Sequence, residues 1–143
     1  MSTKTKIGPI SDGEGYSTGK TIKNHSYEVS NDGESLALMN FLDKNTSVEW
    51  GNKLMVNKQG TKVNLLMTSH EFDTITLGIL QTRPYFDKGF QVIRDDHIHP
   101  GTSKMHQEPS VGDKKVGIDI LKKSPKATFR ILNQGKYYNY IPK

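Results

Sequence analysis

Two histidines separated by one residue, His97 and His99, are the positions whose types and spacing point most directly to chemistry. In an extended chain, residues i and i+2 point to the same side about 7 Å apart. Two imidazoles at this spacing can therefore lean together and bind one metal ion. Pro100 follows and ends the strand, because proline has no amide hydrogen to donate to a neighbouring strand. The segment predicts a pair of metal ligands at the end of a strand, with Ile98 facing the core.

Ser110, followed three positions later by Asp113, supplies the next candidates. A glycine-containing loop after Pro100 lets the chain turn back, so that Asp113 can provide a third ligand while Ser110 caps its helix. Because the chain has no cysteine, a zinc ion would have to be held by imidazole and carboxylate groups. Two imidazoles and one carboxylate leave the fourth position of zinc to water, as in catalytic sites. We therefore predict a single hydrolytic Zn²⁺ centre with His97, His99 and Asp113 as its ligands.

Activation of that water requires a base outside the set of metal ligands. Glu49 is the preferred candidate, because it interrupts the apolar segment 48–50, where a charge is costly unless it is used. Glu71 is the competing candidate. A loop histidine, His106, could be a fourth ligand, a substrate contact or an exposed loop residue.

Simpler interpretations of the same residues stay open. His97 and His99 could be a solvated loop pair. Asp113 could be an acid favoured by the dipole at a helix N-terminus, and Ser110 a plain N-cap. Glu49 could be an edge-strand charge that discourages aggregation.

The elements that must position these residues follow from the spacing of apolar side chains. Apolar positions at 36–42, after Asn-Asp-Gly at 31–33, predict a helix, and 113–122 suits a second one. Strands are predicted at 47–50, 53–56, 61–67, 89–94, 127–132 and 136–141, with turns at 57–60 and 133–135. The stretch 71–80 fits neither period and is left open. The sum is an α+β fold with a mixed central sheet flanked by helices, in which residues 1–31 are a polar linker or arm and 32–143 the folded domain.

Composition and charge narrow the function classes. The 143 residues hold 20 basic and 15 acidic side chains, a formal net charge of +5, but the lysines are scattered and form no dense tract. No aromatic and basic motif accompanies the charge, so nucleic acid is not the expected partner. No apolar run approaches the roughly 20 residues that span a bilayer, and no signal peptide begins the sequence. These features indicate a polar, soluble protein without a membrane partner.

The pattern of His97-x-His99-Pro and Ser110-x-x-Asp113, with Glu49 on an upstream strand, resembles the JAMM/MPN metalloprotease domain of deubiquitinating enzymes and their bacterial relatives. The resemblance implies a sandwich fold of the kind shared with cytidine deaminases. It also implies zinc on the two histidines and the aspartate, Glu49 as general base and acid, and Ser110 as a hydrogen-bond donor to the oxyanion.

Within that superfamily, the run Asn-Thr-Ser-Val-Glu-Trp at 45–50 most resembles the JAB-like toxin domains at the C-termini of large bacterial polymorphic (Rhs-type) secreted proteins. The resemblance implies a zinc metallopeptidase that cleaves peptide or isopeptide amides. It further implies delivery into a target cell as the C-terminal domain of a larger bacterial protein, and a cognate immunity protein that blocks the site. Two alternatives stay open, a degenerate zinc-binding interaction domain and a zinc-dependent hydrolase acting on nucleic acid, although nucleobase deaminases normally use cysteine ligands.

Overall fold

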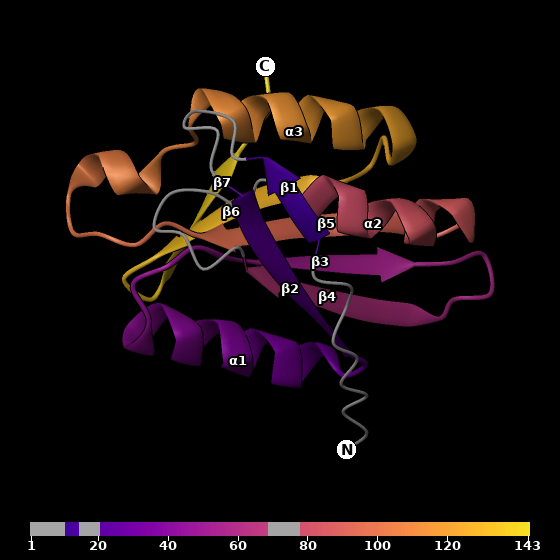
Figure 1. Cartoon of the computed structure of the whole chain (residues 1–143), viewed down its shortest axis with the longest axis horizontal. Coiled ribbons are helices and arrows are strands. Elements are labelled where there is room, and N and C mark those ends of the chain that lie inside the picture. Colours follow the sequence, from indigo (N-terminus) through magenta and orange to yellow (C-terminus); the bar gives the residue numbers. More distant parts are fainter. Residues whose placement is uncertain (1–10, 15–20, 69–77) are drawn as a thin grey trace.

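The chain folds around one mixed β-sheet with helices on both faces, which confirms the α+β class and the mixed central sheet expected from the sequence (Figure 1). The computed structural model describes residues 11–14, 21–68 and 78–143. The strands are β1 (Ser11–Glu14), β2 (Thr21–Val29), β3 (Trp50–Val56), β4 (Lys62–Thr68), β5 (Gln91–Ile98), β6 (Thr128–Asn133) and β7 (Lys136–Tyr140). The helices are α1 (Asp32–Asn45), α2 (Gly78–Asp87), α3 (Val111–Lys123) and the short 3-10 helix η1 (Lys104–Gln107).

The strand order is β1-β2-β4-β3-β5-β6-β7. All neighbouring strands run antiparallel except β5 and β6, which are parallel. A parallel pair needs a crossover connection, and here the crossover carries η1 and α3. This topology returns the chain across the sheet after β5 and brings the N-terminus of α3 near the end of that strand.

The first predicted helix is confirmed as α1, and its two ends are capped. The side chain of Asn31 accepts the Glu34 N–H at 3.0 Å, and Glu34 lies in the first turn, where the helix dipole favours an acid. Beyond Asn45, the N–H and the hydroxyl of Thr46 both donate to the Leu42 carbonyl, at 2.9 and 2.7 Å. The chain leaves the helix there and runs directly to Glu49 and β3.

Both predicted hairpins are confirmed. β3 and β4 pair antiparallel around a turn in which Gly60 has φ of 83°. One strand, β3, replaces the two expected at 47–50 and 53–56, and residues 47–49, Glu49 included, lie in the chain before it. Between β6 and β7, Gln134 and Gly135 have φ of 50° and 78°. Two consecutive positive φ angles are what a type I′ turn requires.

Part of the segment expected to be a linker or arm, residues 1–31, belongs to the sheet. Residues Thr21–Val29 form β2, which pairs antiparallel with β4. Its sequence, TIKNHSYEV, has too few apolar positions to show a strand period. The strand therefore depends on its pairing with the edge of β4 and not on its own side-chain pattern. Of the stretch left open at 71–80, the described residues 78–80 begin α2 (Gly78–Asp87), a helix that was not predicted and that contains Pro84.

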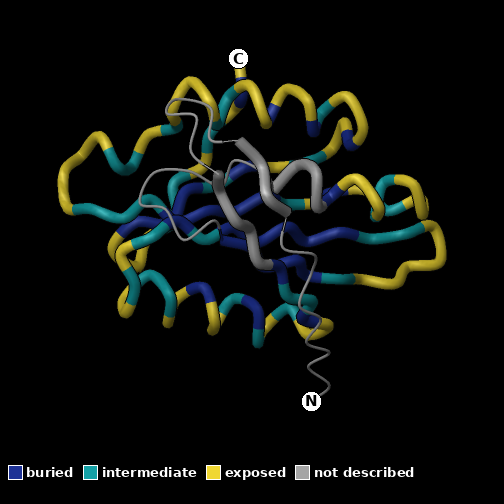
Figure 2. The backbone as a smooth tube through the Cα atoms, in the orientation of Figure 1, coloured by how far each residue is buried: buried dark blue, intermediate teal, exposed yellow. Residues whose placement is uncertain are grey.

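Two apolar cores lie on opposite faces of the sheet, and Figure 2 shows the buried positions concentrated on the central strands between the helices. The core beneath α2 and α3 consists of Met55, Leu65, Met67, Val92, Ile120 and Phe129. The core beneath α1 consists of Met39, Ile98 and Leu132. Full burial of each such side chain contributes about 1.5–3 kcal/mol. Among the described residues, no helix has both the length and the apolar character needed to cross a membrane.

Candidate metal centre

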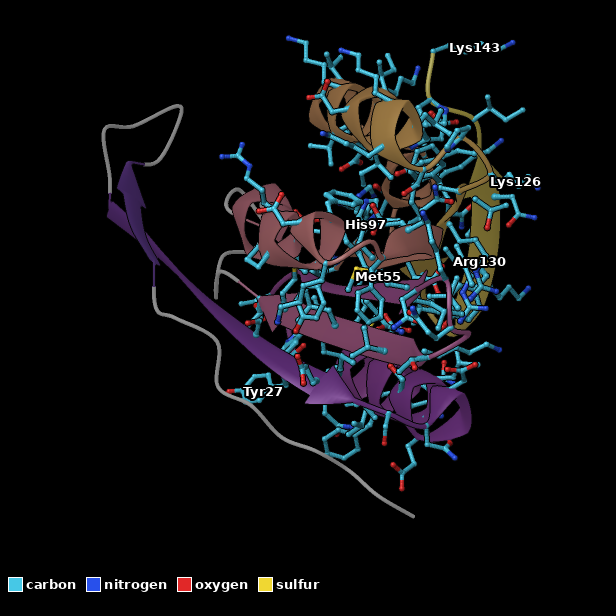
Figure 3. All side chains as sticks on the ribbon, turned by 90° about the vertical axis from the view of Figure 1, so that its right-hand side faces the viewer. Tyr27, Met55, His97, Lys126, Arg130 and Lys143 are labelled. Atoms are coloured by element: carbon cyan, nitrogen blue, oxygen red, sulfur yellow. The ribbon has the colours of Figure 1, made fainter. Side chains whose placement is uncertain are left out.

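His97 and His99 lie on the same side of the chain at the end of β5, as the alternation of a strand requires. Their Nε2 atoms are 2.9 Å apart, and their ring centroids are 4.6 Å apart. Ile98, between them, points to the opposite face and is 1% exposed in the core beneath α1. Because Ile98 is fixed in that core, the two imidazoles are held on the face covered by α3 (Figure 3, where His97 lies in the interior between α3 and α1).

Asp113 reaches both imidazoles from the first turn of α3. Its two carboxylate oxygens lie 3.2 Å from His97 Nε2 and 3.1 Å from His99 Nε2. A reciprocal cap fixes the aspartate, since the Ser110 N–H donates to Asp113 Oδ2 at 2.7 Å and the Asp113 N–H donates to Ser110 Oγ at 3.0 Å. Ser110 is thus the N-cap of α3, and its hydroxyl proton remains available for donation to another group.

Glu49 approaches the histidines from the chain just before β3. The register of β3 and β5 pairs Gly51 with His97, which places Glu49, two residues earlier, beside the end of β5 on the same face. Its carboxylate Oε1 lies 3.8 Å from His99 Nε2, and the residue is 5% exposed. Its backbone carbonyl accepts the Thr68 hydroxyl at 2.7 Å, which ties it to β4.

The donor atoms of this four-residue cluster, His97, His99, Asp113 and Glu49, suit a bound metal ion. One ligand atom from each of Glu49, His97 and His99 lies within 4.8 Å of the other two. Ligand atoms about 2.0–2.1 Å from a tetrahedral ion are about 3.3 Å apart. The distances of 2.9, 3.1 and 3.2 Å among the two Nε2 atoms and the Asp113 oxygens are close to that spacing. Imidazole and carboxylate groups are also the ligands that zinc accepts in the absence of cysteine.

The cluster is strongly coupled electrostatically. Burial alone would lower the pKa of His97, but its hydrogen bond to Asp113 and the nearby carboxylates outweigh burial and raise that pKa. Burial would raise the pKa of Asp113, yet the hydrogen bonds from His97 and His99 hold it well below its usual range. The aspartate is therefore ionised and available as a ligand at any physiological pH.

Three further residues beside His97 were missed from the sequence. Lys53 and Asp95 form a buried ion pair with 3.4 Å between Nζ and Oδ1. Asp95 lies two positions before His97 on the same strand, so the strand period could have placed it on the same face. The Tyr140 ring stands edge-on to His97, with 6.1 Å between ring centroids. Burial, together with nearby carboxylates, raises the pKa of Tyr140, which therefore stays neutral.

The two other candidates from the sequence are Glu71 and His106. Glu71, the competing base, lies outside the described residues. His106 lies in η1, where its ring contacts Ser103 and its main-chain carbonyl oxygen lies 3.1 Å from His99 Nδ1. The structure thus connects His106 to the cluster through its backbone.

A known family model matches the part of the chain that contains this cluster. Residues 27–122, more than half of the chain, match the family model described as JAB-like toxin 1. The matched segment contains all four residues of the cluster and runs from β2 into α3. No curated protein and no solved structure matches the chain. The chain belongs to the JAB-like toxin 1 family, which confirms the expected resemblance to JAB-like toxin domains.

Proposed function

We propose, starting from membership of the JAB-like toxin 1 family, that this domain is a zinc-dependent metallopeptidase of JAMM type that hydrolyses peptide or isopeptide amide bonds. One observation carries the proposal. Two imidazoles and the Asp113 carboxylate converge within 3.2 Å of one another, and a second, buried carboxylate, that of Glu49, lies 3.8 Å from His99. That combination is a ligand set with an adjacent base.

The proposed roles of the residues are supported by their positions. A zinc ion held by His97, His99 and Asp113 would polarise the amide carbonyl and lower the pKa of the attacking water. Glu49 accepts the proton of that water and returns it to the leaving amine, and burial keeps its carboxylate poorly hydrated and reactive. Ser110 accepts the Asp113 N–H with its oxygen, so its O–H can donate to the oxygen of the substrate carbonyl as negative charge develops there.

The setting is also part of the proposal. A family of toxin domains is consistent with action inside a target cell. We propose delivery as the C-terminal domain of a larger bacterial protein, a protein or peptide as substrate, and a cognate immunity protein that covers the metal centre.

A second candidate function follows from the position of Glu49. Its Oε1 is close enough to the histidines to be a metal ligand itself. If Glu49 completes the ligand set, no base remains next to the metal, and the domain would bind zinc for interaction with a partner without hydrolysing it.

The test is the Glu49→Gln variant, with Glu34→Gln on α1 as the matched control. Both proteins would be loaded with zinc and incubated with unstructured protein substrates and a lysine-linked isopeptide substrate, and products would be identified by mass spectrometry. We expect Glu49→Gln to keep one zinc and to lose activity by about 10²–10⁴-fold, and Glu34→Gln to behave as wild type. Loss of zinc from Glu49→Gln would favour the interaction domain, and retained activity would refute Glu49 as the base.

A further inference from the structure

His99 is held, on the side of its ring away from the cluster, by the main chain of His106. His99 Nδ1 lies 3.1 Å from the His106 carbonyl oxygen. A carbonyl oxygen accepts hydrogen bonds and cannot donate one, so His99 Nδ1 carries the proton of the contact. Because Nδ1 is committed to the carbonyl, Nε2 is the ring nitrogen left to bind a metal ion, and this atom faces His97 and Asp113. The carbonyl therefore fixes which nitrogen of His99 points into the cluster.

The position of that carbonyl is set by the short helix η1. The His106 N–H donates to the Ser103 carbonyl at 3.0 Å. The ring of His106 folds back over the same residue, where its Nδ1 accepts the Ser103 N–H at 3.2 Å and lies 2.9 Å from Ser103 Oγ. Ser103 thus holds His106 by both its backbone and its ring.

A glycine makes room for this arrangement. Gly101 has φ of 128°, a conformation that side chains rarely adopt. A Cβ atom at this position would lie 2.4 to 2.7 Å from three atoms of the His106 ring, far inside the 3.5–4.0 Å or so at which carbon atoms pack. Any side chain at Gly101 would therefore displace the His106 ring.

The backbone on either side of Pro100 is tied to β6. Asn133, which is 1% exposed, donates from Nδ2 to the His99 carbonyl at 2.8 Å and to the Gly101 carbonyl at 3.0 Å. The His99 N–H donates to the Leu132 carbonyl at 3.1 Å. The start of the loop is therefore as firmly fixed as the strand that precedes it.

We infer that His106, Gly101 and Asn133 are positioning residues of the metal centre. Asn133 anchors the backbone at Gly101, Gly101 admits the His106 ring, and the His106 carbonyl holds the Nδ1–H side of His99 so that Nε2 points into the cluster. This inference rests on the proposed metal centre. Partners that orient a histidine ligand in this way typically change metal affinity about 10–100-fold when they are lost.

The test uses Gly101→Ala and His106→Ala, with Gly60→Ala as the matched control. Gly60 also has a positive φ, of 83°, but a Cβ there would meet nothing within 4 Å. The first readout is whether His99 Nδ1 carries a proton in the metal-free protein, from long-range proton–nitrogen correlation NMR. The second is the zinc dissociation constant, from competition with a chelator, and circular dichroism would check that each variant is folded.

We expect wild type and Gly60→Ala to show Nδ1–H at His99 and the same zinc affinity. Gly101→Ala and His106→Ala should lose the preference for a proton on His99 Nδ1 and bind zinc about 10–100-fold more weakly. His106→Ala decides the matter if Gly101→Ala fails to fold. Variants that keep the wild-type proton on Nδ1 would overturn the inference, as would variants with unchanged zinc affinity. If wild type binds no zinc, the proposed function fails, and the Nδ1 readout alone decides whether these residues position His99.

Discussion

Replacement of Asp96 by asparagine should cost a large part of the stability of the metal-free protein. Asp96 is completely buried, and its carboxylate accepts from Arg130 Nε at 2.8 Å, Arg130 Nη2 at 2.6 Å and Arg94 Nε at 3.0 Å. The introduced asparagine would be uncharged and would turn an amide N–H towards one of these guanidinium groups. Removal of one partner from a buried ion pair costs about 3–5 kcal/mol. Since both arginine side chains remain 22% exposed, we expect the lower end, about 3 kcal/mol.

The assay is urea unfolding in the presence of a chelator, so that metal binding does not contribute. With a slope of about 1–3 kcal/mol per molar urea, the midpoint should fall by about 1–3 M. Asp119→Asn is the matched control, because the Asp119 side chain is 64% exposed and its pair with Lys122 is a surface contact at 3.3 Å. That variant should change stability by less than about 0.5 kcal/mol. An Asp96→Asn protein within 1 kcal/mol or so of wild type would refute the reasoning.

Three further predictions concern tyrosines and one glycine. Tyr137→Phe should leave the urea midpoint unchanged or slightly raised, since the buried Tyr137 hydroxyl has no hydrogen-bond partner among the described residues. Stability should fall as pH rises above about 10, because folding raises the pKa values of Tyr85, Tyr137 and Tyr140, and above that pH only the unfolded chain ionises them. The loss is up to about 1.4 kcal/mol per pH unit for each tyrosine. A melting temperature that is flat from pH 9 to 11 would contradict this. Gly117→Ala should lower the melting temperature, because the new Cβ would lie 2.4 Å from Pro142 Cγ. This is the opposite of the usual effect of replacing glycine by alanine in a helix. An unchanged or higher melting temperature would show that the tail carrying Pro142 moves freely.

Much of the fold was predictable from local patterns. The apolar spacing of α1 and α3 and the turn residues of the two hairpins act over a few residues, so one sequence suffices to find them. β2 could not be found in this way, because its strand state depends on the edge of β4 and its own side chains are mostly polar. α2 also could not be found from local pattern, because a proline such as Pro84 is uncommon inside a helix.

In the candidate site, too, some features follow from local spacing and others depend on distant parts of the chain. The spacing of His97 and His99 on one strand, and of Ser110 and Asp113 on one helix turn, is local and predicts their pairings directly. The approach of Glu49 to the histidines depends on the register between β3 and β5, which no local pattern determines. Backbone groups were inaccessible to sequence reasoning, because a carbonyl such as that of His106 carries no signal in its residue type.

Zinc stoichiometry tests the central claim most directly. Purified wild type, His97→Ala, Asp113→Ala and the surface control Asp119→Asn would be loaded with zinc and dialysed, and metal per chain would be measured by elemental analysis. The ligand geometry predicts one zinc per chain in wild type and in Asp119→Asn, and loss of that zinc from both His97→Ala and Asp113→Ala. A wild type that retains no zinc, or an Asp113→Ala variant that retains a full equivalent, would contradict a zinc centre built on these residues.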